Sequence, residues 1–318
     1  MIQTPLMSSS PGAVRASLIV NTSSRIGAEA LIAARAGFAA AGLADVHEVV
    51  FHRGDSLDAA ITEALERDPQ LLVVGGGDGT VACAAGRVAG TETVLGVIPM
   101  GTANDFARTM GIPPSVTGAL DTLLNGHVVD VDLGRVNGHA FLNLASMGLS
   151  VGVTEHLSPV LKRRLGAMAY PVATLRAYRR HEPLTCRLRF PDGDHESLEV
   201  RDVLQLAVGN GVHYGGGNTV APSASIDDDL LDVYAISRGR LHHHVSIARK
   251  LKNGSFVGHE RVLHLSTRRL VVETDRPALV NADGELSATT PATFEVHRNA
   301  VHLIVPSAST AAVWDGTR

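Results

Sequence analysis

The sequence lacks the features that mark several common classes of protein. It has two cysteines, Cys83 and Cys186, which excludes a disulfide framework and gives no metal-ligand spacing. Its formal net charge is −4 at pH 7, so the chain as a whole is not built to bind a polyanion, and we expect no nucleic-acid partner. There is no run of about 18 apolar residues that could span a membrane. The first twelve residues have neither the basic start nor the apolar segment of a signal peptide, so we expect a cytoplasmic protein.

Glycine, by contrast, is concentrated in two short strings, GGGDGT at residues 75–80 and PMGTANDFAR at residues 99–108. Each string follows an apolar run and precedes a stretch that is compatible with a helix. This order predicts a strand, a glycine turn and a helix N-terminus, where backbone N–H groups and the helix dipole attract a phosphate. The candidate phosphate-binding residues are therefore Gly75, Gly76, Gly77, Asp78, Gly79, Thr80, Gly101, Thr102 and Asn104.

A carboxylate lies inside each of the two turns, at Asp78 and Asp105. A carboxylate repels phosphate unless a cation or a transferable proton lies between them. Two phosphate-binding turns with embedded acids therefore favour phosphoryl transfer with magnesium over simple anion binding.

Residues 17–126 alternate between strand-like and helix-like segments, which predicts a parallel sheet with helices on both faces. Ligands of such sheets lie beyond the carboxyl ends of the strands, so we expect Asn21, Asp78 and Gly101 to converge there. The predicted strands are 17–21, 46–51, 71–74 and 94–98, and the predicted helices are 28–41, 57–67, 81–88, 103–110 and 116–124.

After residue 126 the pattern changes to strands joined by turns, which predicts an antiparallel, β-rich, sandwich-like second domain. We predict a nucleotide-binding domain over 15–126, a β-rich lipid-substrate domain over 127–306 and a loose tail over 307–318. Helical interruptions are expected near 151–180 and 241–253. The predicted strands are 128–136, 140–144, 186–190, 198–208, 231–236, 261–273, 278–281 and 293–305.

The two glycine strings resemble those of the diacylglycerol kinase-like lipid kinases, a family that includes bacterial diacylglycerol kinases and sphingosine and ceramide kinases. NAD kinases share the GGDGT turn, but the continuation Asn104–Arg108 is typical of the lipid-kinase branch. The resemblance extends from about Ser17 to about Pro306. It implies an ATP-dependent kinase that uses Mg²⁺ and phosphorylates a hydroxyl of a membrane lipid, diacylglycerol being the best candidate. Two alternatives remain open: a kinase of a soluble substrate such as NAD, and a non-catalytic nucleotide- or lipid-binding regulator.

The resemblance also identifies a loop after the first strand that helps to hold the nucleotide phosphates. Where the family usually has Asn-Pro-x-Ser-Gly, this chain has Asn21, Thr22, Ser23, Ser24 and Arg25, so threonine replaces proline and arginine replaces glycine. Hydroxyls and a guanidinium can still bind phosphate. The alternative is that these residues cap the next helix, because serine and threonine are preferred there.

A second departure lies at the end of the next strand. The family often has a threonine that contacts the nucleotide there, whereas this chain has Phe51 and His52. An ordinary strand-to-helix turn is the alternative.

Asp283 and Glu285 match the family's Asp-Gly-Glu element, which supplies carboxylates to the active site. One of them would accept the proton of the acceptor hydroxyl, while Asp78 and Asp105 would orient magnesium and the transferring phosphoryl group. The residues alone would indicate a plain hairpin turn at this place.

The acidic segment at 227–229 matches an element that supports a structural magnesium ion in the family. The resemblance implies Asp228 and the backbone carbonyls of Ser225 and Leu230 as its ligands, although Asp229 stands where glycine is usual. The alternative is a solvated acidic turn.

A basic stretch at residues 162–180 suggests contact with a membrane. Between Leu157 and Pro183 six basic residues face one acid, Glu182, so the local charge is +5. Apolar residues are interleaved, which suits a peripheral surface that meets anionic headgroups. Lys162 and Arg163 are candidates for contact with the headgroup or with the nucleotide phosphates, and a solvated helix face is the alternative. The oligomeric state is not fixed by the sequence, with which a homodimer is compatible.

Overall fold

The first part of the molecule is a parallel sheet covered by helices. The computed structural model describes residues 14–22, 25–43, 45–52, 54–149, 151, 182–211, 213–214, 218–219, 226–251 and 254–314. The elements of the first part are β1 (Ala16–Asn21), α2 (Arg25–Ala40), β2 (Val46–Phe51), α3 (Leu57–Leu65), β3 (Leu71–Gly76), α4 (Asp78–Val88), β4 (Val94–Pro99), α5 (Asp105–Thr109) and α6 (Val116–Asn125).

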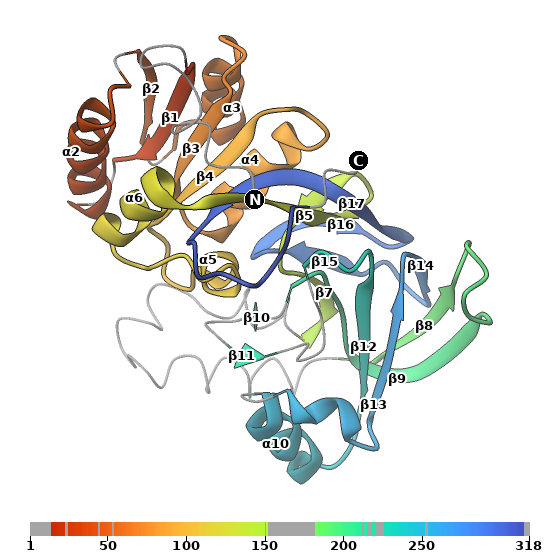
Figure 1. Ribbon diagram of the computed structural model, residues 1–318. Helices are drawn as coiled ribbons and strands as arrows, with labels where there is room; N and C mark the ends of the chain where they lie inside the picture. The colour runs from red at the N-terminus through yellow and green to blue at the C-terminus, as the bar shows by residue number, and fades with distance from the viewer. Residues whose placement is uncertain are drawn as a thin grey trace.

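The strands of this part lie in the order β2, β1, β3, β4, and all of them are parallel. Helices α2 and α6 pack together on one face, and α3 and α4 pack together on the other (Figure 1). Because the sheet is covered on both faces, its strands are continuous apolar runs: every residue of β3 and of β4 is buried. The predicted doubly wound α/β fold is confirmed.

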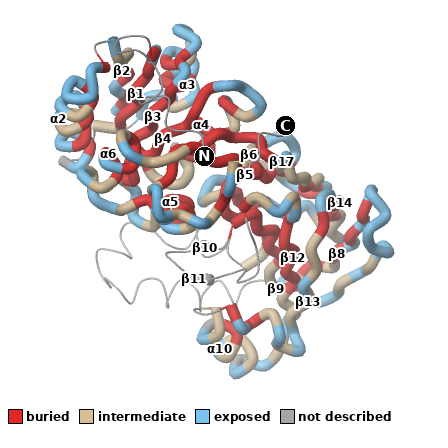
Figure 2. The backbone as a smooth tube through the Cα atoms, in the orientation of Figure 1, coloured by how far each residue is buried: buried red, intermediate tan, exposed pale blue. Residues whose placement is uncertain are grey.

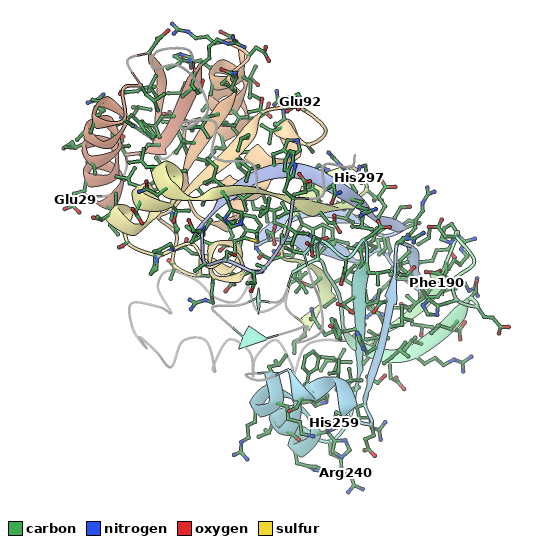
Figure 3. All side chains as sticks on the ribbon, in the orientation of Figure 1. Glu29, Glu92, Phe190, Arg240, His259 and His297 are labelled. Atoms are coloured by element: carbon green, nitrogen blue, oxygen red, sulfur yellow. The ribbon has the colours of Figure 1, made fainter. Side chains whose placement is uncertain are left out.

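The second part is an antiparallel, β-rich arrangement, as the sequence predicts. At its far end α10 and η3 cover the β12–β13 pair, and Figure 3 places Arg240 and His259 at this tip. Its elements are β5 (His127–Val136), β6 (His139–Phe141), β7 (Leu144–Gly148), β8 (Leu184–Arg189), β9 (Leu198–Gly209), β10 (His213–Tyr214), β11 (Asn218–Thr219), β12 (Leu231–Ser237), α10 (Leu241–Lys250), η3 (Ser255–Gly258), β13 (Val262–Thr267), β14 (Arg269–Thr274), β15 (Leu279–Ala282), β16 (Glu285–Thr289) and β17 (Ala292–Val305).

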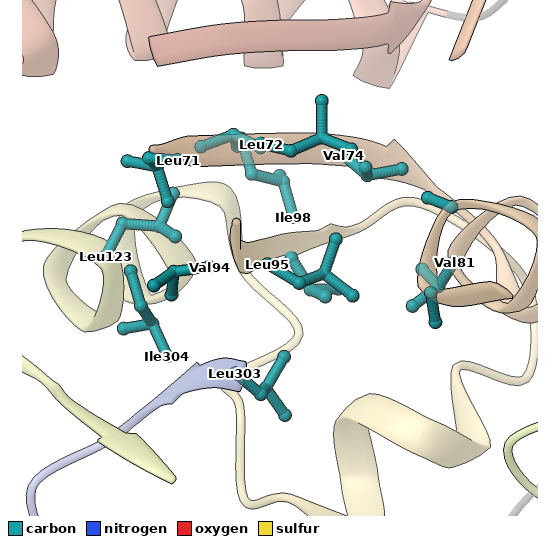
Figure 4. Packing of buried hydrophobic residues seen from close by; sticks show 14 of the residues in the cluster. Leu71, Leu72, Val74, Val81, Val94, Leu95, Ile98, Leu123, Leu303 and Ile304 are labelled. Atoms are coloured by element: carbon teal, nitrogen blue, oxygen red, sulfur yellow. The ribbon is translucent and has the colours of Figure 1, made fainter. Parts of the chain in front are cut away.

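The long strand β17 joins the two parts. Its end runs parallel to β4, with His302 opposite Val94 and Leu303 opposite Leu95, and the same strand pairs antiparallel with β5 and β14. Figure 4 shows Leu303 and Ile304 packed beside Val94 and Leu95. A single sheet, in the order β16-β15-β7-β9-β8-β14-β17-β4-β3-β1-β2, therefore passes from one part into the other.

Burial follows this sheet. Figure 2 shows buried residues along the central strands of both parts and exposed residues on the outer helices and turns. One core cluster fills the α/β part and includes the end of β17, and a second fills the antiparallel part around Phe141 and Phe294. Among the described residues, no helix is both long and apolar enough to cross a membrane.

Three strand predictions were wrong in detail. The strand predicted at 140–144 is two strands, β6 and β7, because the backbone between them donates to Asp283 instead of to a neighbouring strand. The strand predicted at 261–273 breaks at Arg268, where β13 pairs with β12 but β14 pairs with β8 and β17. Strand β16 was not predicted, since the sequence Glu-Leu-Ser-Ala-Thr has no apolar run. The helix predicted at 151–180 lies almost wholly outside the described residues.

The prediction of a loose tail is wrong for residues 307–314. The Val313 N–H donates to Asp227 at 3.0 Å, and the Val313 carbonyl accepts from the Asp130 N–H at 3.1 Å. The Trp314 ring lies 4.8 Å from the ring of His302, and His302 in turn is hydrogen-bonded to the Asp130 carboxylate. The tail is therefore held against β5 and β17 through backbone contacts that no local sequence pattern indicates.

Candidate functional site

The two predicted glycine turns lie against each other at the carboxyl ends of β3 and β4. A Cβ atom placed on Gly101 would lie 2.6 Å from the Cα of Gly77, which is closer than side chains tolerate. The Met100 N–H also donates to the Gly76 carbonyl at 2.8 Å. Glycine at position 101 thus lets the two backbones meet, and the turns that carry Asp78 and Gly101 lie together as expected. That Asn21 joins them stays a prediction.

The first of these turns opens the N-terminus of α4. Gly77 is the N-cap residue, and no side chain caps the helix. Within the part of the chain that the structure describes, the N–H groups of Asp78, Gly79 and Thr80 have no hydrogen-bond partner, and the first intrahelical bond is from Val81 to Gly77. These donors at a helix N-terminus form an arrangement that can bind a phosphate.

Asn104 fixes the second turn. Its amide group closes on Gly101 in both directions, with Oδ1 accepting from the Gly101 N–H at 2.8 Å and Nδ2 donating to the Gly101 carbonyl at 2.9 Å. The backbone of Asn104 is left-handed, with φ 50°, a conformation that asparagine adopts more readily than most residues. Asn104 therefore holds the shape of this turn, and its contact with a nucleotide stays a prediction.

Asp78 links the two turns to the second part of the molecule. Its Oδ1 accepts from the Phe106 N–H at 3.0 Å, at the start of α5, and from the Asn143 side chain at 3.5 Å. Asp105, the other predicted acid, is buried at 4% exposure. The carboxylate of Asp78 thus faces N–H donors, which offset its charge within the predicted phosphate-binding turn.

Asp283 is held by the backbone between β6 and β7. Its two oxygens accept from the N–H groups of Leu142 at 2.6 Å, of Asn143 at 3.1 Å and of Leu144 at 3.1 Å. The pKa of Asp283 is raised to about 6. Burial is the largest cause and the nearby Asp78 adds to it, while the three N–H groups act in the opposite direction. Both oxygens are engaged, so this side chain anchors the β15–β16 turn.

Glu285, two residues further on, has a different environment. It is exposed, and its side chain forms no hydrogen bond or ion pair with the described residues. A Cβ atom placed on Gly79 would lie 3.0 Å from Glu285 Oε1, so the carboxylate lies directly against this glycine. Glu285 therefore brings a free carboxylate from the second part of the molecule to the first glycine turn.

The loop after β1 is described in part. Thr22 Oγ1 lies 3.2 Å from His52 Nδ1, so the two segments that depart from the family pattern are neighbours. A Cβ atom on Gly27 would lie 1.9 Å from the Asn21 carbonyl oxygen, so the start of α2 packs on the end of β1. Ser23 and Ser24 lie outside the described residues, as does the side chain of Arg25.

The acidic turn at 227–229 has a partner for each carboxylate. Asp227 accepts from Val313, Asp228 accepts from the Leu230 N–H at 3.1 Å, and Asp229 lies 3.0 Å from Arg268. Asp229, where the family usually has glycine, keeps a left-handed backbone with φ 60°.

Below this turn Asp132 accepts from the N–H groups of Asp229 and Asn299, both at 2.7 Å. Burial raises the pKa of Asp132 to about 6. Over the residues with assigned positions, no group of three or more His, Cys, Asp or Glu side chains is close enough to hold a metal. Ser225, Lys162 and Arg163, which complete the predicted ligand and headgroup contacts, lie outside those residues.

Sequence reasoning missed Asn143, which links the two parts. Its side chain donates to Asp78 and its backbone donates to Asp283, while its Oδ1 atom is buried and has no partner among the described residues. No local signal could have identified it, because Asn143 stands in an apolar stretch with no turn or motif around it.

Comparisons with known proteins agree with this arrangement. Residues 15–136 match the family model described as the diacylglycerol kinase catalytic domain, and residues 143–305 match the YegS C-terminal NAD kinase beta sandwich-like domain. A diacylglycerol kinase of Bacillus subtilis (strain 168) is 30% identical over 256 residues, which cover 80% of this chain and 83% of that protein. A Pseudomonas aeruginosa (strain PAO1) protein named "Probable lipid kinase YegS-like" is 35% identical over 295 residues, covering 92% of this chain and 95% of that protein.

Two solved structures from Bacillus anthracis str. Sterne share the fold. The first has a TM-score of 0.78 at 27% identity and covers 96% of this chain and 99% of that one. The second, described as a diacylglycerol kinase, has a TM-score of 0.69 at 25% identity and covers 92% and 97% of the two chains.

Proposed function

Because the chain belongs to the family of diacylglycerol kinases and YegS-like lipid kinases, we propose that it transfers the γ-phosphoryl group of ATP to a hydroxyl of diacylglycerol. The lipid-kinase class follows from the family, and the substrate and the nucleotide are our proposal. The observation that carries it is the meeting of a free carboxylate, Glu285, with the uncapped N-terminus of α4 at Gly79.

The two glycine turns would bind the ATP phosphates. The N–H groups of Asp78, Gly79 and Thr80 point from the start of α4, and Gly77 and Gly101 leave the backbone uncovered by side chains. Backbone donors of this kind are fixed before the reaction begins, so they stabilise developing charge on the phosphoryl oxygens without reorganising.

The residues at this site fit a magnesium ion. Asp78 Oδ1 is taken by two donors, whereas Oδ2 accepts no hydrogen bond from the described residues and could coordinate a cation. Magnesium bound with nucleotides needs one or two carboxylates, and it would neutralise part of the phosphate charge.

Glu285 would accept the proton of the acceptor hydroxyl. A lipid hydroxyl is a poor nucleophile at neutral pH, so a base must take its proton as the new O–P bond forms and ADP leaves. Glu285 has a free carboxylate at the turn, while both oxygens of Asp283 are occupied by backbone donors. Asp283 then acts as a positioning residue for the turn that carries Glu285.

The lipid acceptor requires access to a membrane surface. We propose that the basic stretch at residues 162–180 meets anionic headgroups there, on the strength of its local charge of +5 on a chain of net charge −4. This segment belongs to the same half of the chain as Glu285.

To test the proposal, the purified protein is incubated with ATP labelled in its γ-phosphate and with one of two acceptors, either diacylglycerol in mixed micelles or NAD. We expect label in the lipid fraction as phosphatidic acid. Label in NADP instead would establish the alternative of a kinase for a soluble substrate. Binding of ATP with no transfer to either acceptor would favour a non-catalytic regulator.

A further inference from the structure

A cavity of about 240 Å³ lies beside Glu285, between α4 and the hairpins of the second part. One wall is a face of α4 whose residues are small, with Gly79, Ala82, Cys83 and Gly86 recurring at helical spacing and Arg87 at the end. The opposite wall is Arg135, Gly138, His139, Ala140, Ala282, Asp283, Glu285 and Ser287. The small side chains on α4 leave room that a larger residue would fill.

Arg135 lines this cavity and is held only by uncharged groups. Its guanidinium donates to the Gly138 carbonyl at 2.9 Å and to the Gly86 carbonyl at 3.4 Å, and neither partner carries a charge. Its Nε atom is buried and makes no hydrogen bond to any described residue. No acidic side chain in the described part of the chain forms an ion pair with it. A buried N–H donor on a cation with no acceptor favours a ligand that supplies one.

The other charged groups of the cavity are already compensated or lie at its other end. Arg87 pairs with Asp58 at 2.5 Å, and Asp283 is engaged by backbone N–H groups. Burial, together with Asp58 and Glu285, raises the pKa of Cys83, which keeps this thiol neutral. Glu285 adjoins Gly79, and Arg87 lies eight positions further along α4, which is about 12 Å of helix.

We propose that the Arg135 end of this cavity is an anion site that binds a phosphate group. A guanidinium with fixed geometry suits a phosphate, and His139 also lines the cavity. The phosphate could come from a lipid headgroup or from the free ion, because both present the same oxygens. The phosphate would lie along the same face of α4 as the proton acceptor. This relation rests on the proposed role of Glu285, whereas the existence of the anion site does not depend on that role.

The test measures phosphate binding to the full chain in saturating ADP, so that the glycine turns are occupied. Titration with inorganic phosphate is followed by calorimetry for the wild type, Arg135→Met, Arg135→Lys and Arg67→Met, the last removing an exposed arginine outside the cavity. We expect Arg135→Met to weaken binding at least about tenfold, the smallest effect expected for losing hydrogen bonds to a charged group. Arg135→Lys should retain part of the affinity, and Arg67→Met should bind as the wild type does.

A second arm identifies the source of the phosphate. The same variants are sedimented with phosphatidylcholine vesicles that do or do not contain phosphatidic acid. If the binding of inorganic phosphate depends on Arg135, the site takes the free ion. If only the binding of vesicles that contain phosphatidic acid depends on Arg135, the site takes a lipid headgroup. If Arg135→Met does not fold, Ser287→Phe blocks the cavity from β16 without a change of charge and should weaken both kinds of binding.

The proposal is overturned if the Arg135 and Ser287 variants bind phosphate and vesicles as the wild type does. Because the readout is binding and not turnover, this failure is distinct from a failure of the kinase assay.

Discussion

Two carboxylates separated by one glycine, Asp283 and Glu285, lie in opposite environments. Asp283 is enclosed, with both oxygens bonded to backbone N–H groups, and its backbone is left-handed with φ 46°. Glu285 is exposed and lies against Gly79. The sequence left open which of the two accepts the proton, because two acids at this spacing look alike until the turn between them places one inward and one outward.

The raised pKa of Asp283 predicts a pH dependence of stability that an amide in its place would not share. With a pKa of about 6 in the folded state and about 4 in the unfolded chain, the folded protein keeps a proton that the unfolded chain has lost. The free energy of unfolding of the wild type should therefore fall as pH rises from 4 to 6, by about 2 to 3 kcal/mol from this group.

Urea denaturation of the wild type and of Asp283→Asn at several pH values between 4 and 7 measures this contribution. The free energy of unfolding of the wild type, relative to that of the variant, should fall as pH rises through this window. A difference between the two proteins that stays constant with pH would show that burial does not perturb this carboxyl group.

At the scale of single elements, the two glycine turns can meet only because neither backbone carries a side chain at the point of contact. We predict that Gly101→Ala forces the turns apart, since its Cβ would lie 2.6 Å from the Cα of Gly77. Overpacking of this kind costs roughly 1–3 kcal/mol in stability, and it should also weaken ATP binding.

Gly37→Ala in α2 is the matched control, because its Cβ would meet nothing closer than 3.9 Å and alanine favours a helix. Thermal unfolding and nucleotide titration should show Gly37→Ala unchanged or stabilised. If Gly101→Ala binds ATP as the wild type does, the turns do not hold the phosphates in the way proposed.

The elements also show which parts of the fold a sequence can predict. The turns around Gly77 and Gly101 could be recognised because each carries its own signal, an apolar run followed by glycine and a helix. Strand β16 and Asn143 could not, because what defines them is a partner distant in the chain: β15 for the strand, and Asp78 for the side chain. Arg135 is a similar case, since its unpaired Nε becomes evident only once β5 lies beside α4.

At the scale of the whole molecule, β17 makes the two parts dependent on each other. Leu303 is fully buried, lies opposite Leu95 of β4 and Val129 of β5, and belongs to the core of the α/β part. We predict that Leu303→Ala costs about 2–5 kcal/mol and lowers the stability of both parts together, because the cavity lies at their shared sheet.

Chemical denaturation followed by circular dichroism and by the fluorescence of Trp314 tests this prediction. The two probes should report one shifted transition, while Leu279→Ala, at a position with 43% exposure, should unfold within about 0.5 kcal/mol of the wild type. Two separate transitions, of which only one moves, would mean that the parts unfold independently.

The same interdependence defines the proposed active site, since the predicted phosphate-binding turn belongs to one part and Glu285 to the other. Figure 1 shows α4 and the β15–β16 pair on the two sides of this junction. In the function we propose, Glu285 completes a kinase site whose nucleotide side is built without it.

The most direct test compares Glu285→Gln with the wild type in ATP affinity and in phosphoryl transfer to diacylglycerol at saturating ATP. We expect near-normal ATP binding and a loss of turnover of roughly 10²- to 10⁴-fold, the usual contribution of a general base. Turnover at the wild-type rate by a variant that binds ATP normally would contradict it.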